Sequence, residues 1–107
     1  MALSTNTQSS NQVRNNAIGK AVSDAAAAAA VTFTCGFLPR AVRFYNITDR
    51  ISDIWYEGMA AASSLHTVAA GTVTLEATNG ITVTANGFTV TAVTMVASKS
   101  FAWEAVG

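Results

Sequence analysis

The chain has 107 residues, which is enough for one ordinary domain and too few for two. Apolar residues make up 50% of the sequence and charged residues only 11%, so little charge is left to cover a surface, and we expect the chain to associate with other chains. The formal net charge is zero and the six Lys and Arg residues are scattered, which argues against direct binding to nucleic acid.

Cys35 is the only cysteine, so no disulfide can form within the chain, and a lone thiol of this kind is usually a small core residue. The N-terminus, Met-Ala-Leu-Ser-Thr-Asn, has neither the basic start nor the apolar run of a signal peptide. No apolar stretch reaches the ~18 residues that suggest a membrane-spanning helix. We therefore expect neither export through a signal peptide nor a membrane partner.

Residues 1–30 are expected to form an extended N-terminal arm. Residues 1–20 are rich in Ser, Thr, Asn and Gln, and they carry too few apolar side chains to offset the entropy of ordering, so the free arm is predicted to be disordered. Ser23 and Asp24 then precede an alanine run, Ala25–Ala30, which is typical of an N-cap followed by helix formers. A run this short is marginal as an isolated helix, so a helix and an extended tether both stay open.

From residue 31 the apolar positions alternate, as in strands with one buried face. Residues 31–35 and 42–45 predict two strands, and residues 46–50 supply turn formers. Residues 51–56 predict a third strand that is apolar on both faces, with Trp55 on one face and Tyr56 on the other. Such a strand is either central in a sheet or lies at an interface.

The second half of the chain predicts more strands. Residues 59–70 are small and show no period, so we expect a loop with one helical turn. Residues 71–91 predict a three-strand meander with turns at Asn79-Gly80 and Asn86-Gly87. A last strand is expected over residues 101–105.

Both turns of the meander are assigned from the register that pairs apolar residues with one another. At the second turn, a two-residue type I′ loop pairs Val83 with Val90. At the first turn, a three-residue loop with Gly80 in the left-handed conformation pairs Leu75 with Val83.

These elements predict an all-β fold, a small antiparallel β-sandwich or barrel of six or seven strands. The expected organisation is a polar and Ala-rich arm over residues 1–30 and a β domain over residues 31–107. A body of this size buries only about 60% of its unfolded surface. We expect it to be marginally stable alone and to gain stability from partners.

Candidate catalytic residues are few. His66 is the only histidine, and a hydrolytic triad would need it beside a serine and an acid, yet no Gly-x-Ser-x-Gly motif is present. A zinc site built from Cys35 and His66 lacks the usual paired spacings. No Gly-rich phosphate loop or dinucleotide motif occurs. We therefore expect no catalytic residues, no metal, no cofactor, no small-molecule substrate and no enzymatic activity.

Asp49, Asp53 and Glu57 recur at intervals of four, which on a helix would align three carboxylates for metal or acid/base chemistry. The segment has a strand pattern, so structural roles are favoured. We expect Asp49 to cap a turn and the other two acids to pair with a nearby arginine (Arg40, Arg43 or Arg50).

Aromatic side chains are a further candidate surface, because they stack on bases or sugars when exposed. Most are expected in the core, and the set is Phe37, Tyr45, Trp55, Tyr56 and Trp103. An arginine beside an exposed aromatic is also a frequent anchor in protein interfaces. The interface residues that we predict are Arg43, Tyr45 and Trp55.

Two segments carry a motif, Gly36–Arg50 (GFLPRAVRFYNITDR) and Trp55–Met59 (WYEGM). They resemble a group of small tailed-phage proteins with the pattern GFxPRxV, NxTDR and W-[FY]-EGM. As in that group, the C-terminal half is rich in Thr and Gly and ends in an aromatic-x-Glu-Ala strand. The likeness covers about residues 33–107.

The resemblance implies a structural component of the virion, above all a capsid decoration (cement) protein that binds the major capsid protein and stabilises the head. Such a protein is made in the host cytoplasm and lies on the capsid surface. We expect it to form a homo-oligomer, a trimer or dimer. A tail, baseplate or head-fibre component and a carbohydrate-binding β module are the alternatives.

Overall fold

The computed structural model of the chain describes residues 15–107, which form an all-β domain of eight strands. Every neighbouring pair of strands is antiparallel, so the predicted antiparallel all-β class is confirmed, with one strand more than expected. Residues 1–14, which belong to the expected arm, lie outside the described residues. The strands are β1 (Asn16–Val22), β2 (Val31–Thr34), β3 (Ala41–Asn46), β4 (Ile51–Tyr56), β5 (Ser63–Thr67), β6 (Val73–Thr84), β7 (Gly87–Val90) and β8 (Ser100–Val106).

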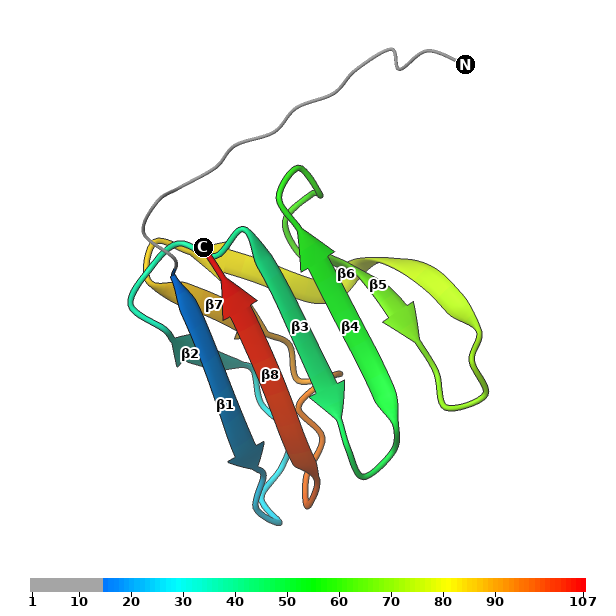
Figure 1. Ribbon diagram of the computed structural model, residues 1–107. Coiled ribbons are helices and arrows are strands. Elements are labelled where there is room, and N and C mark those ends of the chain that lie inside the picture. The colour runs from blue at the N-terminus through cyan, green and yellow to red at the C-terminus, as the bar shows by residue number, and fades with distance from the viewer. Residues whose placement is uncertain (1–14) are drawn as a thin grey trace, which may run out of the picture.

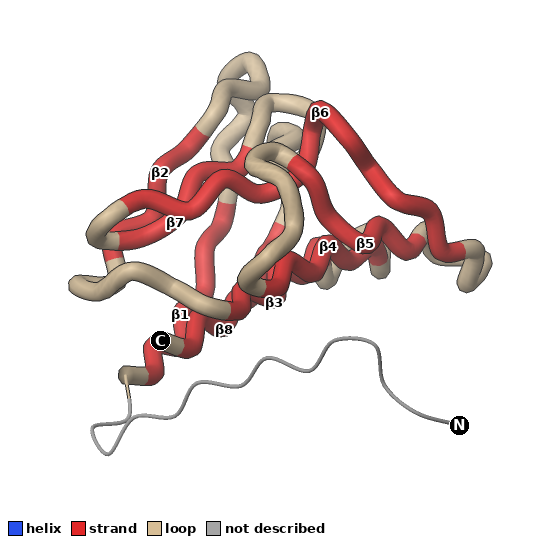
Figure 2. Tube along the Cα trace, turned by 90° about the horizontal axis from the view of Figure 1, so that it is seen from above, coloured by secondary structure: helices blue, strands red, loops and turns tan. Residues whose placement is uncertain are grey.

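The strands form one curled sheet, a half-barrel in the order β1-β8-β3-β4-β5-β6-β7-β2 (Figure 1). A large layer consists of β1, β8, β3, β4, β5 and the first half of β6. The second half of β6 continues into a small layer with β7 and β2. Figure 2 shows β7 and β2 above the large layer. The two edges of the sheet are therefore β1 and β2, although these strands follow each other in the chain.

The core fills the space between the two layers and is rich in aromatic rings. Phe88 of the small layer stacks on Phe33 at 5.2 Å between ring centroids and meets Trp103 edge-on at 5.3 Å. Phe44 of the large layer stacks on Phe101 at 5.4 Å. Such ring pairs stabilise a fold beyond the area that they bury. The buried hydrophobic residues are Val42, Phe44, Trp55, Ile81, Phe88, Val90, Met95, Phe101 and Ala105.

The strands predicted over residues 31–35, 42–45, 51–56 and 101–105 are confirmed as β2, β3, β4 and β8. Because β4 lies between β3 and β5, its two apolar faces mark a central strand. The turn from β3 to β4 is held by two side chains. The Asn46 Oδ1 atom accepts a hydrogen bond from the Asp49 N–H at 2.9 Å, and Asn46 Nδ2 donates to Asp49 Oδ2 at 3.0 Å. The turn role expected for Asp49 is confirmed.

The sheet begins at β1, within the segment that the sequence assigns to the arm. The residues of β1 on the core side are Ala17, Gly19 and Ala21, and a Cβ on Gly19 would overlap the Trp103 indole. Residues 23–30 contain no helix and lead from the end of one edge strand to the start of the other, which selects the extended tether. Within residues 15–107 no helix is long and apolar enough to cross a membrane.

The prediction of a loop over residues 59–70 is wrong for residues 63–67, which form β5. The buried or partly buried side chains of this strand include Ser63, Ser64 and His66, whereas Leu65 is exposed. Polar residues therefore face inward and an apolar residue faces outward, the reverse of the usual strand pattern. The segment is a strand because β4 and β6 pair with its two edges.

The three-strand meander is also wrong, because residues 73–84 form the single strand β6. Its first half pairs with β5, with Leu75 opposite Leu65 rather than Val83, and the register shifts between Ser63 and Ser64. Residues 77–80 are the extra residues of this irregularity, so no hairpin loop forms there. Gly80 is not left-handed, and glycine is needed because a Cβ would overlap the Ser63 backbone carbonyl.

The hairpin between β6 and β7 turns one residue earlier than predicted. Thr84 pairs with Gly87, so the two-residue loop is Ala85-Asn86. Neither loop residue has a positive φ, which rules out a type I′ turn. Val83 lies opposite Phe88 instead of Val90, and apolar residues still meet apolar residues.

Gly87→Ala is expected to lower the free energy of unfolding by about 1–3 kcal/mol, the cost of overpacking a close contact. A Cβ on Gly87 would overlap the Phe33 carbonyl oxygen in the neighbouring strand β2, and backbone has little freedom to move aside. Urea unfolding of both proteins measures this difference. The matched control is Asn86→Ala, expected to change stability by less than about 0.5 kcal/mol. An equal loss of unfolding free energy in the two variants would contradict the close approach of Gly87 to the β2 backbone. It would favour a turn with a left-handed backbone at both residues 86 and 87.

Candidate functional site

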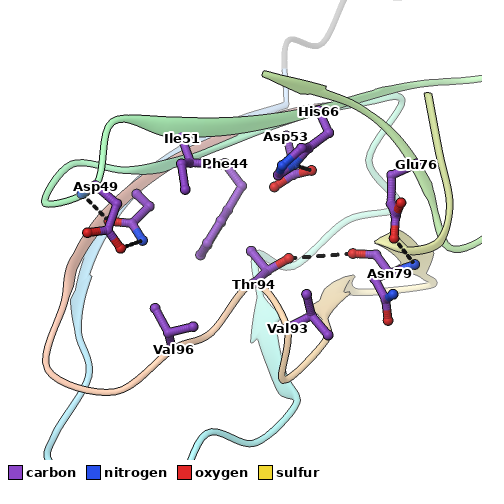
Figure 3. A pocket seen from close by; sticks show the side chains of 11 residues that line it. Phe44, Asp49, Ile51, Asp53, His66, Glu76, Asn79, Val93, Thr94 and Val96 are labelled. Carbon is purple, nitrogen blue, oxygen red and sulfur yellow. Dashed lines mark hydrogen bonds and ion pairs between the residues drawn. The ribbon is translucent and has the colours of Figure 1, made fainter. Parts of the chain in front are cut away.

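One candidate site is a pocket between the layers, lined by residues from β3, β4, β5 and β6 and by the segment between β7 and β8 (Figure 3). Its volume is about 240 Å³. Figure 3 shows Asp53 and His66 on one side of it and Thr94 and Asn79 across from them, with the Phe44 ring as an apolar wall. The volume is below the ~300–1,000 Å³ of usual small-molecule sites.

Asp53, Ser64 and His66 form a hydrogen-bonded group that we call the polar cluster. Asp53 on β4 lies directly opposite His66 on β5. One carboxylate oxygen of Asp53 accepts a hydrogen bond from Ser64 Oγ at 2.7 Å and lies 2.9 Å from His66 Nδ1. An ionised carboxylate only accepts, so the contact with His66 is a hydrogen bond when the imidazole carries a proton on Nδ1. Asp53 is 2% exposed and Ser64 0%, so these bonds offset the cost of burying the acid.

The polar cluster does not have the geometry of a Ser–His–Asp triad. In a triad the serine hydroxyl is hydrogen-bonded to the histidine, whereas Ser64 donates to Asp53. Cys35 lies apart, packed against the core with its thiol 3.4 Å from the Phe37 carbonyl oxygen. Among residues 15–107, no group of three or more His, Cys, Asp or Glu side chains is placed to hold a metal ion. What the cluster does in this geometry is connect β4 to β5.

The three acids at intervals of four have different partners. Glu57 pairs with Arg40 at 3.3 Å, as predicted. Asp49 pairs with Lys99 at 3.1 Å in addition to its role in the turn. The arginine partner predicted for Asp53 is wrong, because the pairing of β4 with β5 brings the other members of the polar cluster to its carboxylate.

A second candidate site is the outer face, by which we mean the face of the large layer turned away from the small layer. The strand register places opposed residues in rows across this face. One row is Ile18, Glu104, Arg43, Ile54, Leu65 and Leu75. The next row is Lys20, Ala102, Tyr45, Ser52, Thr67 and Val73.

Large apolar side chains are exposed over the whole outer face. Each of them is at least 38% exposed, and they are Ile18, Val22, Tyr45, Tyr56, Leu65, Val73, Leu75 and Val106. Charge on this face comes from Lys20 and from Arg43, which pairs with Glu104 at 3.7 Å. A hydrogen bond to Tyr56, supported by the charge of Glu104, raises the pKa of Arg43. Extended apolar patches of this kind on a soluble protein mark surfaces that bind another molecule.

The outer face contains two of the three predicted interface residues. Arg43 and Tyr45 are exposed in the middle of it, on β3. Trp55 faces the opposite way: it is 6% exposed, and its Nε1 donates a hydrogen bond to the Ala60 carbonyl oxygen at 3.2 Å. Trp55 is therefore a core residue, and Tyr56 beside it takes its place on the outer face.

No family model, curated protein or solved structure matches this chain. The function therefore has to be inferred from the two candidate sites. The pocket is small and its buried acid is already paired, whereas the outer face presents apolar side chains that no described part of the chain covers.

Sequence reasoning missed most of the outer face. The sequence predicts a loop at Leu65 and a hairpin in which Leu75 faces the apolar Val83, yet Leu65, Val73 and Leu75 are all exposed. The predicted interface residues Arg43 and Tyr45 pointed to this surface, and so did a second signal, the strand over residues 51–56 with apolar residues on both faces. Finding the other residues of the outer face requires the order of the strands in the sheet, which the sequence alone does not predict.

Proposed function

We propose that this protein is a structural subunit of a bacteriophage virion, a capsid decoration protein that binds the major capsid protein through its outer face. In this role it is made in the host cytoplasm, lies on the capsid surface and stabilises the head. A tail, baseplate or head-fibre component would use the same surface at another position in the particle.

The outer face is the observation that carries the proposal. A decoration protein needs a broad contact surface and no internal chemistry, and a sheet face with exposed aliphatic and tyrosine side chains suits that need. Tyrosine and arginine are the residue types most often found as interface anchors, and Tyr45, Tyr56 and Arg43 lie together on β3 and β4. With a formal net charge of zero, the chain has no overall charge to repel a neighbouring subunit.

The resemblance to tailed-phage proteins supports the same surface. The two segments that carry the motif, Gly36–Arg50 and Trp55–Met59, include all of β3 and the end of β4, at the centre of the large layer. Tyr56, a position that the motif specifies, is exposed on the outer face, and Arg43 and Tyr45 lie on the same face between the first two parts of the motif. The motif residues therefore contribute both to the core under this layer and to the surface above it.

Leu75→Glu is expected to weaken binding to heads built from the major capsid protein of the same phage by about tenfold or more, because a charge would have to be buried in an apolar contact. Cosedimentation of purified protein with heads that lack it measures the affinity. Val93→Glu is the matched control, since Val93 is 66% exposed and Leu75 68%, and Val93 lies beside the pocket instead of on the outer face. Equal affinity of the two variants would contradict docking through the outer face.

Imaging of the intact particle tests the position. A decoration protein gives a lattice of copies over the head, whereas copies confined to one vertex or to the tail would establish an attachment role instead. Absence of the protein from purified particles would overturn the proposal. Glycan binding by an otherwise monomeric protein would then favour the carbohydrate-binding alternative.

A further inference from the structure

The backbone of β1 has an unpaired edge. Ser23 N–H donates to the Lys99 carbonyl oxygen and Gly107 N–H to the Asn15 carbonyl oxygen, both at 2.9 Å, at the two ends of the β1–β8 ladder. Residues alternate in such a ladder, so the odd-numbered residues of β1 bond to β8 and the even-numbered ones direct N–H and C=O away from it. The outward residues are Asn16, Ile18, Lys20 and Val22. Within residues 15–107, no backbone hydrogen bond reaches these four from the other side.

The free edge of β1 carries one feature that discourages pairing in natural sheets, the charge of Lys20, and lacks the others. It is seven residues long, pairs with β8 without a register shift, and contains neither proline nor a bulge. The opposite edge, β2, has only four residues. Two of the most exposed large apolar side chains of the outer face, Ile18 at 74% and Val22 at 77%, also lie on β1. Of the two sheet edges, β1 is therefore the one suited to pairing with another strand.

We propose that β1 pairs with β1 of a second copy of this chain, antiparallel about a two-fold axis at Gly19, to form a dimer with one continuous large layer. A two-fold axis through Gly19 places Ile18 opposite Lys20 of the other copy and Asn16 opposite Val22. All four outward residues then find partners, and every residue of the strand is used.

This register also fits the side chains. With the axis at Gly19, the two lysines do not face each other, and the aliphatic stem of each Lys20 covers an Ile18 of the other copy. An axis at Lys20 would place like charges directly opposite and leave part of the strand unpaired. The dimer contact uses the edge of the sheet and leaves the outer face open, so it does not depend on the proposed docking to the capsid.

Replacing one outward N–H tests the contact. Ile18→Pro removes a donor that β8 does not use, so the fold is expected to remain, as prolines are tolerated on solvent-facing sheet edges. The dissociation constant of the dimer should rise about tenfold or more, because each copy loses a hydrogen bond to its partner. Sedimentation equilibrium of the full chain measures the constant. The control Ile18→Thr keeps the N–H and is expected to dimerise within about threefold of the natural chain.

Cross-linking tests the register, whether or not the proline variant folds. In a Cys35→Ser background, Ile18→Cys and Lys20→Cys chains are mixed and oxidised mildly. The mixture should give far more disulfide dimer than either chain alone, because the two positions face each other across the axis at a Cα separation that a disulfide spans. A natural chain that stays monomeric at high concentration would overturn the dimer. A dimer that shows no preference for the mixture would overturn the β1 register, and neither result bears on capsid binding.

Discussion

Phe88→Ala is expected to lower the free energy of unfolding by about 3–5 kcal/mol, a large part of the 5–15 kcal/mol by which small domains are stable. Phe88 is fully buried, and its ring contacts Phe33, Phe44 and Trp103 at centroid distances of 5.2, 6.3 and 5.3 Å. These rings come from both layers, so the loss of the Phe88 side chain leaves a cavity where the two layers pack against each other. Urea unfolding followed by near-UV circular dichroism measures the change.

The control for this variant is Tyr45→Ala, which removes a ring that is 40% exposed on the outer face. It is expected to cost less than about 1 kcal/mol, because the lost side chain leaves no closed cavity. If Phe88→Ala does not fold, Phe88→Leu should still fold with a loss of about 1–2 kcal/mol. Comparable losses for Phe88→Leu and Tyr45→Ala would contradict the central place of Phe88 in the core.

The fold class and four of the strands, β2, β3, β4 and β8, follow from the sequence, because apolar side chains alternate along three of them and occupy both faces of β4. In β3, Val42 and Phe44 point inward and Arg43 points outward, so the alternation is visible in the residue types. β1 carries no such signal. Its inward residues, Ala17, Gly19 and Ala21, are all small, and at Gly19 the Trp103 indole occupies the space of a side chain, which only the folded sheet shows.

Two of the errors in the second half of the chain have a common cause: an Asn-Gly pair favours a tight turn, but neither Asn-Gly pair forms the predicted turn. Asn79-Gly80 lies in the irregular middle of β6, where a glycine is needed for close approach to Ser63. Gly87 likewise makes room for the β2 backbone, and the turn precedes it. Glycine serves both turns and close contacts between strands, and the sequence alone does not separate the two uses.

The candidate sites were predicted less well than the fold, since both depend on strand order. Asp53 and His66 were singled out separately, but they meet only because β5 pairs with β4. The outer face is a row of residues drawn from strands distant in the chain, such as Ile18 and Leu75. Arg43 and Tyr45 are exposed on it because β3 alternates cleanly, whereas Trp55, predicted with them as an interface residue, lies on the inner side of β4.

The polar cluster is expected to stabilise the fold strongly even though it is not a catalytic triad. Asp53→Ala should lower the free energy of unfolding by about 3 kcal/mol, because Ser64 and His66 would lose hydrogen bonds to a charged acceptor in a site that water reaches poorly. Asp53→Asn keeps an oxygen at the same place and is expected to lose less. Both values come from the midpoint and slope of urea unfolding at constant pH.

Glu57→Ala is the comparison that isolates the effect of burial, since Glu57, in the turn directly after β4, is also an acid in an ion pair, yet its side chain is 61% exposed. Exposed pairs of this kind contribute about 0–1 kcal/mol, so this variant should be close to the natural chain in stability. If Asp53→Ala were as mild as Glu57→Ala, the buried carboxylate would not be needed to join β4 to β5. Its position in the wall of the pocket would then call for another explanation, namely that the acid is kept for a ligand at some cost to the sheet.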